Sequence, residues 1–353
     1  MAGNSLLARP LLWALRRRWP FHLLLTAGFT ALALWRVDLS EVAEPLSEAN
    51  YGWAALALLI LTLVKGLQAV RWRVYLARVG RIPLLSLLGA ILIGNMGNNL
   101  LPMRAGDLAR IQILANRFGV SRAGLAATVF IVEAILDGMV FLVILLAGLA
   151  FLDLGFVPAA ILWSLAFSAG GGFFLTVLVS RFFPADLTAW PWLRFLPGRL
   201  RTLLSSTWPR FLAGLETMRN GRLLAVALGL NLVDWLIQVA AFALFGLAFG
   251  LDIPFSSYLV IMIAANLVVA VPITFQNIGT FEVAMLEVMV ALGVAREEAF
   301  AFVVATHMLT NFWVVATGLV SIWLMRISPR EVFALRQAPA EVPLAKPFPP
   351  LSA

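Results

Sequence analysis

Charged and amide side chains gather in a short stretch that directly follows an apolar run. Its polar members are Asn95, Asn98, Asn99, Arg104, Asp107 and Arg110. Arginine donates charge-assisted hydrogen bonds to phosphate oxygens, and the free N–H groups of a helix that restarts near Gly106 attract anions. We therefore expect at least one of these arginines to bind a substrate phosphate. The alternative is that Asp107 caps the helix and pairs with an arginine only to close a hairpin.

Two further pairs of polar residues are spaced four apart within apolar helical patterns. One pair is Glu133 and Asp137, and the other is His307 and Asn311. Residues at i and i+4 share one face of a helix. An ionisable group inside a bilayer is costly and therefore marks function. We expect each pair to bind a proton, an ion or a lipid head group, and the alternative is hydrogen bonding between helices.

A second proline-interrupted apolar stretch carries Asn277 and Glu282 on either side of Gly279. Glu282 comes shortly after Gly279, as Asp107 comes directly after Gly106. We therefore expect both stretches to contribute to binding. The predicted substrate-binding residues are Asn98, Asn99, Arg104, Asp107, Arg110, Glu133, Asp137, Asn277, Glu282, His307 and Asn311.

Three more polar residues lie in or near apolar stretches, namely Lys65, Gln68 and Asp234. The long side chain of Lys65 is able to extend to the membrane interface. Asp234, in the stretch NLVDWLIQ, is expected to lie deep in the membrane and is a further candidate.

The composition indicates that lipid surrounds most of the chain. Of 353 residues, 62% are hydrophobic and 12% are charged, and the mean hydropathy is +0.95. Soluble domains carry about 25% charged residues. The twelve Trp and twenty-five Phe suit membrane interfaces and the gaps between helices. We predict an all-α polytopic membrane protein.

The apolar stretches divide into two kinds. Six are predicted to span the bilayer, at residues 21–35, 51–70, 125–152, 157–179, 223–249 and 300–325. Two others, at 82–118 and 255–292, are each interrupted by a proline and resume as a shorter helical pattern. A second arm of thirteen residues at about 1.5 Å each is shorter than the hydrocarbon core. We therefore predict two re-entrant hairpins, with tilted short spans as the alternative.

Charge places the segments relative to the membrane, because Lys and Arg mark cytoplasmic loops. The net charge is +8. We predict a cytoplasmic basic segment at 1–20 that leads into a retained first span. The basic connection at 181–222 is predicted to be cytoplasmic, with a surface helix that opens at Pro209. Residues 327–353, with six prolines, are expected to form a disordered cytoplasmic tail, so that both termini are cytoplasmic.

The two halves of the chain, residues 21–152 and 153–326, resemble each other. From Gly119 to Glu133 is fourteen residues, as it is from Gly293 to His307, and the spacings to Asp137 and Asn311 also agree. Each half has two spans, a hairpin and one span. Because three spans is an odd number, the halves should have opposite orientations, as in many alternating-access transporters.

Motifs for enzymatic chemistry are missing from the sequence. We find no HExxH zinc helix, no GxxxxGK[ST] phosphate loop and no GxSxG nucleophile motif. The chain has no cysteine and two histidines. We therefore predict no catalytic residues, metal or cofactor. No nucleic-acid partner is expected either, since loop topology explains the arginines.

Three stretches, NNLLPMRAGDLARI, TVFIVEAILD and VPITFQNIGTFEVAML, resemble the motifs of a known family. It is the lysylphosphatidylglycerol synthase transmembrane-region family, also called flippase-like domain proteins. The resemblance covers residues 15 to 325. The family pattern N-x-x-x-P-x-R-x-G-[DE] is matched at Asn98, Pro102, Arg104, Gly106 and Asp107.

Two other patterns of the family are matched in part. In E-R-x-x-D, Glu133 and Asp137 match, and Ala134 stands where arginine is usual. In P-x-x-x-G-G-x-G-x-x-E, the proline at 272, the glycine at 279 and Glu282 match. Gln276 and Asn277 replace the paired glycines.

The resemblance implies that the protein moves a lipid between leaflets. In the two-domain synthases this region translocates an aminoacylated phospholipid that a separate soluble domain makes, and we expect no such domain here. Stand-alone members are associated with other lipids, including lipid-linked sugars and hopanoid-type molecules. We predict a lipid flippase of the inner membrane, with lipid-synthesising enzymes as candidate partners. The alternatives are an ion-coupled small-solute transporter, a membrane enzyme or a non-transporting partner subunit.

Overall fold

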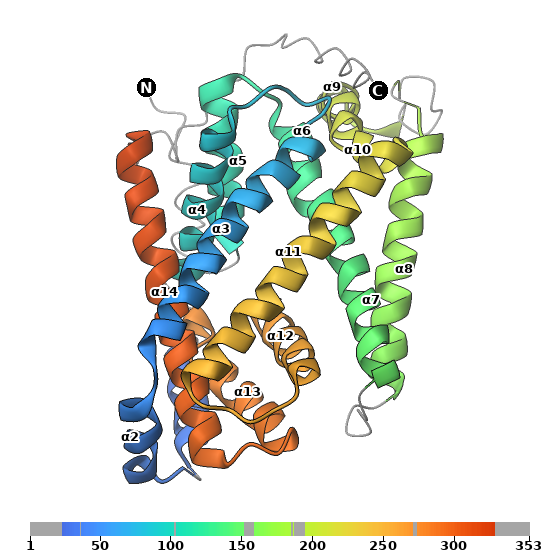
Figure 1. Cartoon of the computed structure of the whole chain (residues 1–353). Helices are drawn as coiled ribbons and strands as arrows, with labels where there is room; N and C mark the ends of the chain where they lie inside the picture. Colours follow the sequence, from blue (N-terminus) through green and yellow to red (C-terminus); the bar gives the residue numbers. More distant parts are fainter. Residues whose placement is uncertain are drawn as a thin grey trace, which may run out of the picture. The chain divides into compact units, whose positions relative to one another are not determined.

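A computed structural model describes residues 23–35, 37–101, 104–151, 159–184, 186, 195–270 and 274–328 (Figure 1). Regular structure in these ranges is helical throughout, without strands. A first helix covers Leu23–Leu34. The others are α2 (Leu39–Glu48), α3 (Tyr51–Tyr75), α4 (Leu84–Leu100), α5 (Ala105–Phe118), α6 (Arg122–Ala126), η2 (Ala127–Glu133), α7 (Ala134–Phe151), α8 (Ala159–Phe182), α9 (Gly198–Gly214), α10 (Glu216–Arg219), α11 (Gly221–Ala248), α12 (Phe255–Ala270), η4 (Phe275–Asn277), α13 (Thr280–Ala291) and α14 (Arg296–Met325).

The all-helical membrane architecture is confirmed, but the count of spans is not. In the described part of the chain, four helical stretches are long and apolar enough to cross a membrane: Tyr51–Tyr75, Arg122–Ile144, Gly221–Ala248 and Arg296–Met325. A fifth is formed if Leu23–Leu34 and Leu39–Glu48, bent by 86°, count as one broken span. The stretch predicted at 157–179 corresponds to α8, of which Ala166–Phe182 is a shorter apolar helix.

The chain packs as two compact units. Unit 1 comprises Met1–Leu58 and Val239–Trp313, and unit 2 comprises Leu59–Gln238 and Val314–Ala353. Three of the long helices, α3, α11 and α14, contribute residues to both units. The predicted repeat boundary at residues 152 and 153 is a different division of the chain, and it stays a prediction.

In unit 2, α4 and α5 form a helical hairpin that matches the first predicted re-entrant segment. Its arms approach so closely that a Cβ on Gly106 would overlap the carbonyl oxygen of Gly94 and lie 2.5 Å from the Asn98 nitrogen. Arg104, which precedes α5, has a left-handed backbone with φ of 53°. The arms have 17 and 14 residues, or about 25 and 21 Å at 1.5 Å per residue, so each is shorter than the core of a bilayer.

In unit 1, α12 and α13 form the second hairpin. Between them the backbone is left-handed at three positions: Gln276 (φ 52°), Asn277 (φ 58°) and Gly279 (φ 84°). Glycine adopts such angles without strain, whereas residues with a Cβ resist them. The departure from the glycine pattern at 276 and 277 therefore leaves Gln276 and Asn277 in a strained conformation.

The span after the first hairpin is a single helix interrupted by a π-helical turn. α6 continues into η2, a seven-residue π-helix that ends at Glu133, and then into α7. π-helical turns inside α-helices occur frequently at functional sites. The glycines at the two matched positions, Gly119 and Gly293, both have positive φ, at 64° and 92°. This is a local likeness between the two halves, although no such π-turn interrupts α14.

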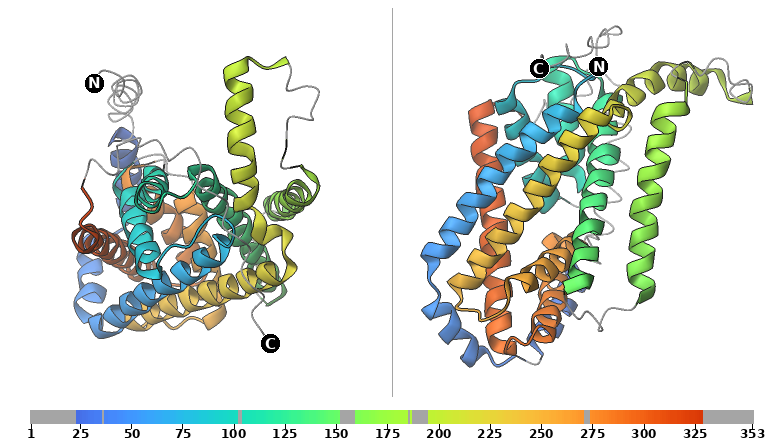
Figure 2. Two further views of the ribbon diagram at one scale, coloured as in Figure 1. Left: turned by 90° about the horizontal axis from the view of Figure 1, so that it is seen from above. Right: turned by 45° about the vertical axis from the view of Figure 1, so that its right-hand side comes forward.

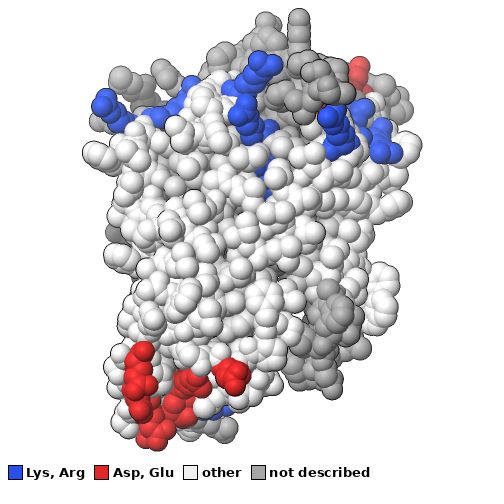
Figure 3. All heavy atoms as spheres, in the orientation of Figure 1, with Lys and Arg blue, Asp and Glu red and all other residues white. Residues whose placement is uncertain are grey.

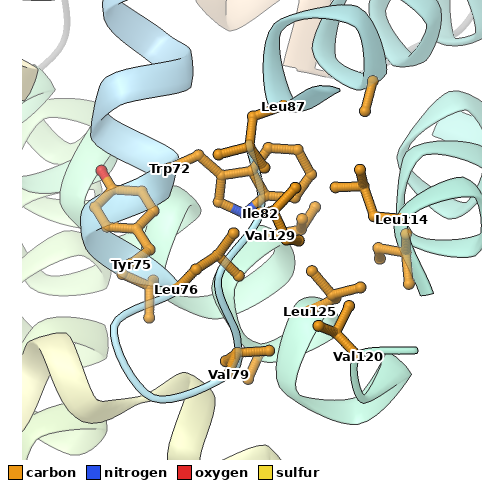
Figure 4. Close-up of a cluster of buried hydrophobic side chains, with 14 of the residues drawn as sticks. Trp72, Tyr75, Leu76, Val79, Ile82, Leu87, Leu114, Val120, Leu125 and Val129 are labelled. Carbon is orange, nitrogen blue, oxygen red and sulfur yellow. The ribbon is translucent and has the colours of Figure 1, made fainter. Parts of the chain in front are cut away.

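The core of unit 2 is a cluster of buried apolar side chains that α3, α4, α5, α6 and η2 share. Figure 4 shows Trp72, Leu87, Leu114 and Leu125 in this cluster. Trp72 also donates a hydrogen bond of 3.0 Å to the hydroxyl of Thr128. Because lipid tails are as apolar as these side chains, close packing rather than the hydrophobic effect holds such helices together. The packing fixes α3 and α5 beside η2.

The basic connection of residues 181–222 does contain a helix, but the predicted start at Pro209 is wrong. α9 begins after Pro197 and contains Pro209 within its length. Hydroxyl groups near the proline bond to backbone carbonyls, for example Thr207 to Leu203 at 2.7 Å. Figure 2 shows α9 running crosswise to α8, as a helix at the membrane surface would.

Charged side chains on the face in Figure 3 concentrate at one end of each unit. In unit 1 the acidic groups gather around α2, and in unit 2 the basic groups gather near α5, α6 and α9. The interpretations of residues 1–20 and of most of the tail from 327 lie outside the described residues.

Candidate functional site

The candidate site in unit 2 is built on one polar face of α3. Lys65, Gln68, Arg71 and Tyr75 follow each other at helical spacings of three or four, which places them on one side of the helix. The sequence prediction ended this span at residue 70 and assigned Arg71 to a loop. That assignment is wrong, because α3 continues to Tyr75 and Arg71 is only 3% exposed.

Arg71 is the centre of an ion-pair network. Its Nη1 lies 3.0 Å from Oδ1 of Asp137 and 2.9 Å from Oδ2 of Asp234. The same guanidinium donates to the amide oxygen of Asn231, and its Nη2 lies 3.9 Å from Oε1 of Glu133. Removal of an arginine from water is costly unless its charge is neutralised and its donors are bonded, and these four side chains meet both requirements.

Arg110 forms a second centre beside the first. Its Nη2 lies 3.0 Å from Oε2 of Glu133 and 2.9 Å from Oδ1 of Asp107. The guanidinium also lies over the ring of Trp72, with 5.0 Å to the ring centre, within the range of a cation–π interaction. Glu133 thus bridges the two buried arginines.

The tip of the first hairpin extends this network to the surface of the unit. Arg104 Nε lies 2.9 Å from Oδ2 of Asp107, and the Arg104 side chain is 60% exposed. The backbone N–H of Asp107 donates to Oδ1 of Asn98 at 3.1 Å. Asp107 therefore pairs with an arginine on either side, and Asn98 rather than Asp107 bonds to the start of α5. Asn99 lies near the end of α4.

Gln68 links a further cation to the network. Lys65 Nζ donates to the Gln68 amide oxygen at 3.2 Å, and the Gln68 amide group donates to Asp234 at 3.3 Å. Gln238 also donates to Asp234, at 3.1 Å. Asp234, a secondary candidate from the sequence, is therefore a central member of the site.

The charges of this network balance. Its cations are Lys65, Arg71, Arg104 and Arg110, and its carboxylates are Asp107, Glu133, Asp137 and Asp234. With every group ionised, four positive charges face four negative charges.

A cavity of about 20 Å³ lies between the two arginines. It is lined by Gln68, Arg71, Trp72, Tyr75, Ile91, Asn95, Arg110 and Glu133. This volume holds about one water molecule. Two buried donors beside it, the hydroxyl of Tyr75 and Nε of Arg110, have no hydrogen-bond acceptor among the described residues. The cavity therefore offers donors to an oxygen atom.

Unit 1 contains a second cluster of predicted residues. Oε1 of Glu282 lies 2.6 Å from Nδ1 of His307, and Oε2 accepts a hydrogen bond from the N–H of Gly279 at 2.6 Å. The ring of Phe281 stacks on His307 with 4.2 Å between ring centres. Glu282 thus caps α13 and holds the histidine, and its role in substrate binding stays a prediction.

The other predicted residues of unit 1 lie on the elements that carry this pair or next to them. Asn277 lies at the hairpin turn, where its carbonyl oxygen accepts from the Thr280 hydroxyl at 3.0 Å. Asn311 lies one turn after His307 on α14. The described residues contain no group of three or more His, Cys, Asp or Glu placed to hold a metal ion.

Sequence reasoning missed Arg71, Asn231 and Tyr75. A usable pattern was present, because the polar residues of α3 repeat every three or four positions within an apolar helix. On α11, Asn231, Asp234 and Gln238 repeat in the same way. The basic residues after position 70 resemble the charges of a cytoplasmic loop, and this resemblance conceals the stripe on α3.

Long apolar helices with an ion-pair network between them define a multi-pass helical membrane protein. The model of the family described as "Lysylphosphatidylglycerol synthase TM region" matches residues 20–318. The chain belongs to this family. It is also similar to a protein of Haloferax volcanii named Glycosyltransferase AglD, with 26% identity over 341 residues. That alignment covers 87% of this chain and 54% of the relative, so the chain spans about half the relative's length. No solved structure matches.

Proposed function

We propose that the protein is a lipid transporter that moves a phospholipid or a lipid-linked head group between the leaflets of a membrane. The observation that carries this proposal is the pair of buried arginines, Arg71 and Arg110, that share Glu133 beside a cavity lined with hydrogen-bond donors. Guanidinium groups bind phosphate oxygens at well-defined geometry. A membrane protein rarely retains such groups in its spans without a functional reason.

In the proposed mechanism, the head group enters among the polar side chains while the acyl chains stay in lipid. Arg71 and Arg110 hold the phosphate. As the phosphate binds, Glu133 gives up its ion pairs with these two arginines. A cavity of about 20 Å³ is smaller than any lipid head group. The proposed mechanism therefore requires the site to widen before a lipid head group enters.

Several expectations from the sequence remain part of the proposal. The protein acts in the inner or plasma membrane with both termini in the cytoplasm, and it performs no catalysis. Glu282 and His307 of unit 1 remain proposed substrate-binding residues. The two predicted halves alternate the access of the site between leaflets.

The proposal is tested by reconstitution of the full chain into vesicles with fluorescent lipids in one leaflet. The lipids include phosphatidylglycerol and its lysyl ester, because the family is named after lysylphosphatidylglycerol synthase, and a lipid-linked sugar, because the Haloferax volcanii relative is named a glycosyltransferase. Arg71→Lys and Arg110→Lys keep the charge but lose the planar, forked donor set. We expect each variant to slow translocation at least tenfold. Arg201→Gln, which removes an exposed cation from α9, should leave the rate unchanged.

Two outcomes would count against the proposal. If folded wild-type protein moves none of these lipids, the flippase reading is wrong, and uptake of a water-soluble solute would support the small-solute transporter instead. If the purified protein converts a lipid into a new product, the enzyme reading is correct. Size-exclusion profiles and thermal midpoints establish that each variant is folded.

A further inference from the structure

Glu133 differs from the other carboxylates in its relation to the two buried arginines. It alone among the described carboxylates pairs with both, at 3.9 Å from Arg71 and 3.0 Å from Arg110. Its side chain is 25% exposed, whereas those of Asp107 and Asp234 are 3% and 1% exposed. Glu133 also lines the cavity. A ligand that enters the cavity therefore meets Glu133 together with both guanidinium groups.

The cavity is built to accept an oxygen atom with lone pairs. The hydroxyl of Tyr75 and Nε of Arg110 are buried donors that find no acceptor among the described residues, and both side chains line the cavity. A buried polar group without a partner costs about 1–3 kcal/mol, so a ligand oxygen that satisfies these donors is stabilised there. Phosphate esters carry such oxygens with negative charge.

The charge balance of the network opposes a bound anion unless one other charge changes. Four cations face four carboxylates. A phosphate diester adds one negative charge to this neutral set. An uncompensated charge in a low-dielectric interior is so unfavourable that the group takes up a proton instead. One proton on one carboxylate restores the balance.

We infer that a phosphate-bearing head group binds to Arg71 and Arg110 together with one proton, and that Glu133 is the carboxylate that takes the proton. The inference rests on the proposed function and deepens it, because it names a phosphate ester as the ligand and a proton as the coupled ion. The proton comes from water and converts the Glu133 carboxylate to a carboxylic acid, so that the phosphate takes the place of Glu133 on each guanidinium group while the other ion pairs of Arg71 and Arg110 remain.

The charged and titratable groups around Glu133 come from α3, α5 and α11 as well as from its own helix. Arg71 and Tyr75 approach from α3, and Arg110 from α5, with Asp107 behind Arg110. Asp137 lies one turn further along Glu133's own helix, and Asp234 shares Arg71 from α11, while Lys65 is bound to Asp234 through Gln68. When the phosphate replaces Glu133 on the arginines, Glu133 loses both of its ion pairs, while Asp107 and Asp137 keep theirs, so the surplus negative charge lies at Glu133.

The experiment measures proton uptake on binding by calorimetry of the purified full chain in detergent. Titrations with dihexanoyl phosphatidylglycerol are repeated in buffers that differ in ionisation enthalpy. Dimethyl phosphate forms a second arm, because it presents the same diester without a lipid, and neither ligand titrates near neutral pH. We expect about one proton to be taken up per phosphatidylglycerol bound. By linkage, the Kd should rise about tenfold per pH unit above neutrality.

Glu133→Gln should bind phosphatidylglycerol with no proton uptake and with a Kd that is independent of pH. Glu287→Gln is the matched control, since Glu287 is 61% exposed and pairs with Arg296 in unit 1, and it should behave as wild type. Equal uptake with dimethyl phosphate would show that the diester alone is recognised, and uptake with the lipid alone would show that the glyceride is needed. Both results support the inference.

The inference is overturned if wild-type protein binds phosphatidylglycerol without proton uptake, or if Glu133→Gln takes up as many protons as wild type. It is also overturned if neither ligand binds. These failures are distinguishable from failure of the proposed function, because lipid translocation in vesicles is measured separately and does not depend on the calorimetry.

Discussion

Nη1 of Arg71 on α3 lies 2.9 Å from the carboxylate of Asp234 on α11, and both side chains are almost fully buried, at 4% and 1% exposed. The two helices come from distant parts of the sequence and each belongs to the set of long apolar spans. The positive charge of Arg71 and the negative charge of Asp234 cancel only while both side chains are present. Removal of either partner leaves an uncompensated charge in a membrane protein's interior.

We therefore predict that Arg71→Met destabilises the protein by about 3–5 kcal/mol, because three carboxylates then lose their shared cation. The measurement is unfolding in mixed detergent micelles, followed by tryptophan fluorescence. Arg201→Met, at an exposed site on α9, is the control and should change stability by less than about 0.5 kcal/mol. Equal effects of the two substitutions would show that the network does not stabilise the fold.

A second prediction concerns the close approach of α4 and α5. Gly106→Ala should destabilise the protein by about 1–3 kcal/mol, because the new Cβ overlaps the Gly94 carbonyl and the arms must separate. Gly170→Ala is the matched control in α8, where a Cβ meets no described atom within 4 Å. The control should gain about 0.5–1 kcal/mol from helix propensity. A loss at Gly106 no larger than at Gly170 would contradict the packing of the hairpin.

Much of the fold was predictable because apolar length, proline and charge act locally. The hairpins at 82–118 and 255–292 follow from their interrupted patterns, and Glu133 and Asp137 both contact Arg71 as their i, i+4 spacing implies. The pairing of Arg71 with Asn231 and Asp234 was not predictable in the same way. It depends on the packing of α3 against α11 over a long sequence separation, which no local pattern specifies.

The left-handed backbone of the second hairpin gives a third prediction. Gln276 has φ of 52° and ψ of 21°, a conformation that costs a residue with a Cβ about 1–2 kcal/mol. Gln276→Gly should therefore raise the stability of the protein by about 1 kcal/mol. Gln276→Ala removes the same polar group but keeps the Cβ, so it should bring no such gain. If both variants behave alike in thermal unfolding, the backbone strain is not the cause.

A fourth prediction concerns the pH dependence of α2, which Asp38 caps. Asp38 lies outside the four long spans. The hydroxyl and N–H of Ser40 donate to its carboxylate and lower its pKa. A lowered pKa in the folded state stabilises the cap above the ordinary value of about 3.9, and this contribution is lost as the pH falls through the lowered value.

The protection of α2 against hydrogen exchange, corrected for intrinsic rates, should thus be constant from pH 7 to 5 and fall only below about pH 4. Asp38→Asn keeps a capping oxygen without a titrating carboxylate, so its protection should not depend on pH. A drop in wild-type protection near neutral pH would show that another group controls α2.

The π-helical turn before Glu133 gives the last prediction. In a π-turn the hydrogen bonds run from i to i+5 rather than i+4, so the turn holds one extra residue. Deletion of Phe130, which is 43% exposed, should convert η2 to α-helix and keep Glu133 and Asp137 on the face that contacts Arg71.

Deletion of Leu232, 38% exposed, removes a residue from the regular helix α11. The residues on one side of that deletion must then rotate by about 100° relative to the other. That rotation separates Asn231 from Asp234 on the helix surface, so only one of them keeps its bond to Arg71. We expect the Leu232 deletion to cost about 3–5 kcal/mol and the Phe130 deletion less than half as much, by unfolding in detergent. If the Phe130 deletion is the more damaging of the two, the π-turn is needed to place Glu133 between the arginines.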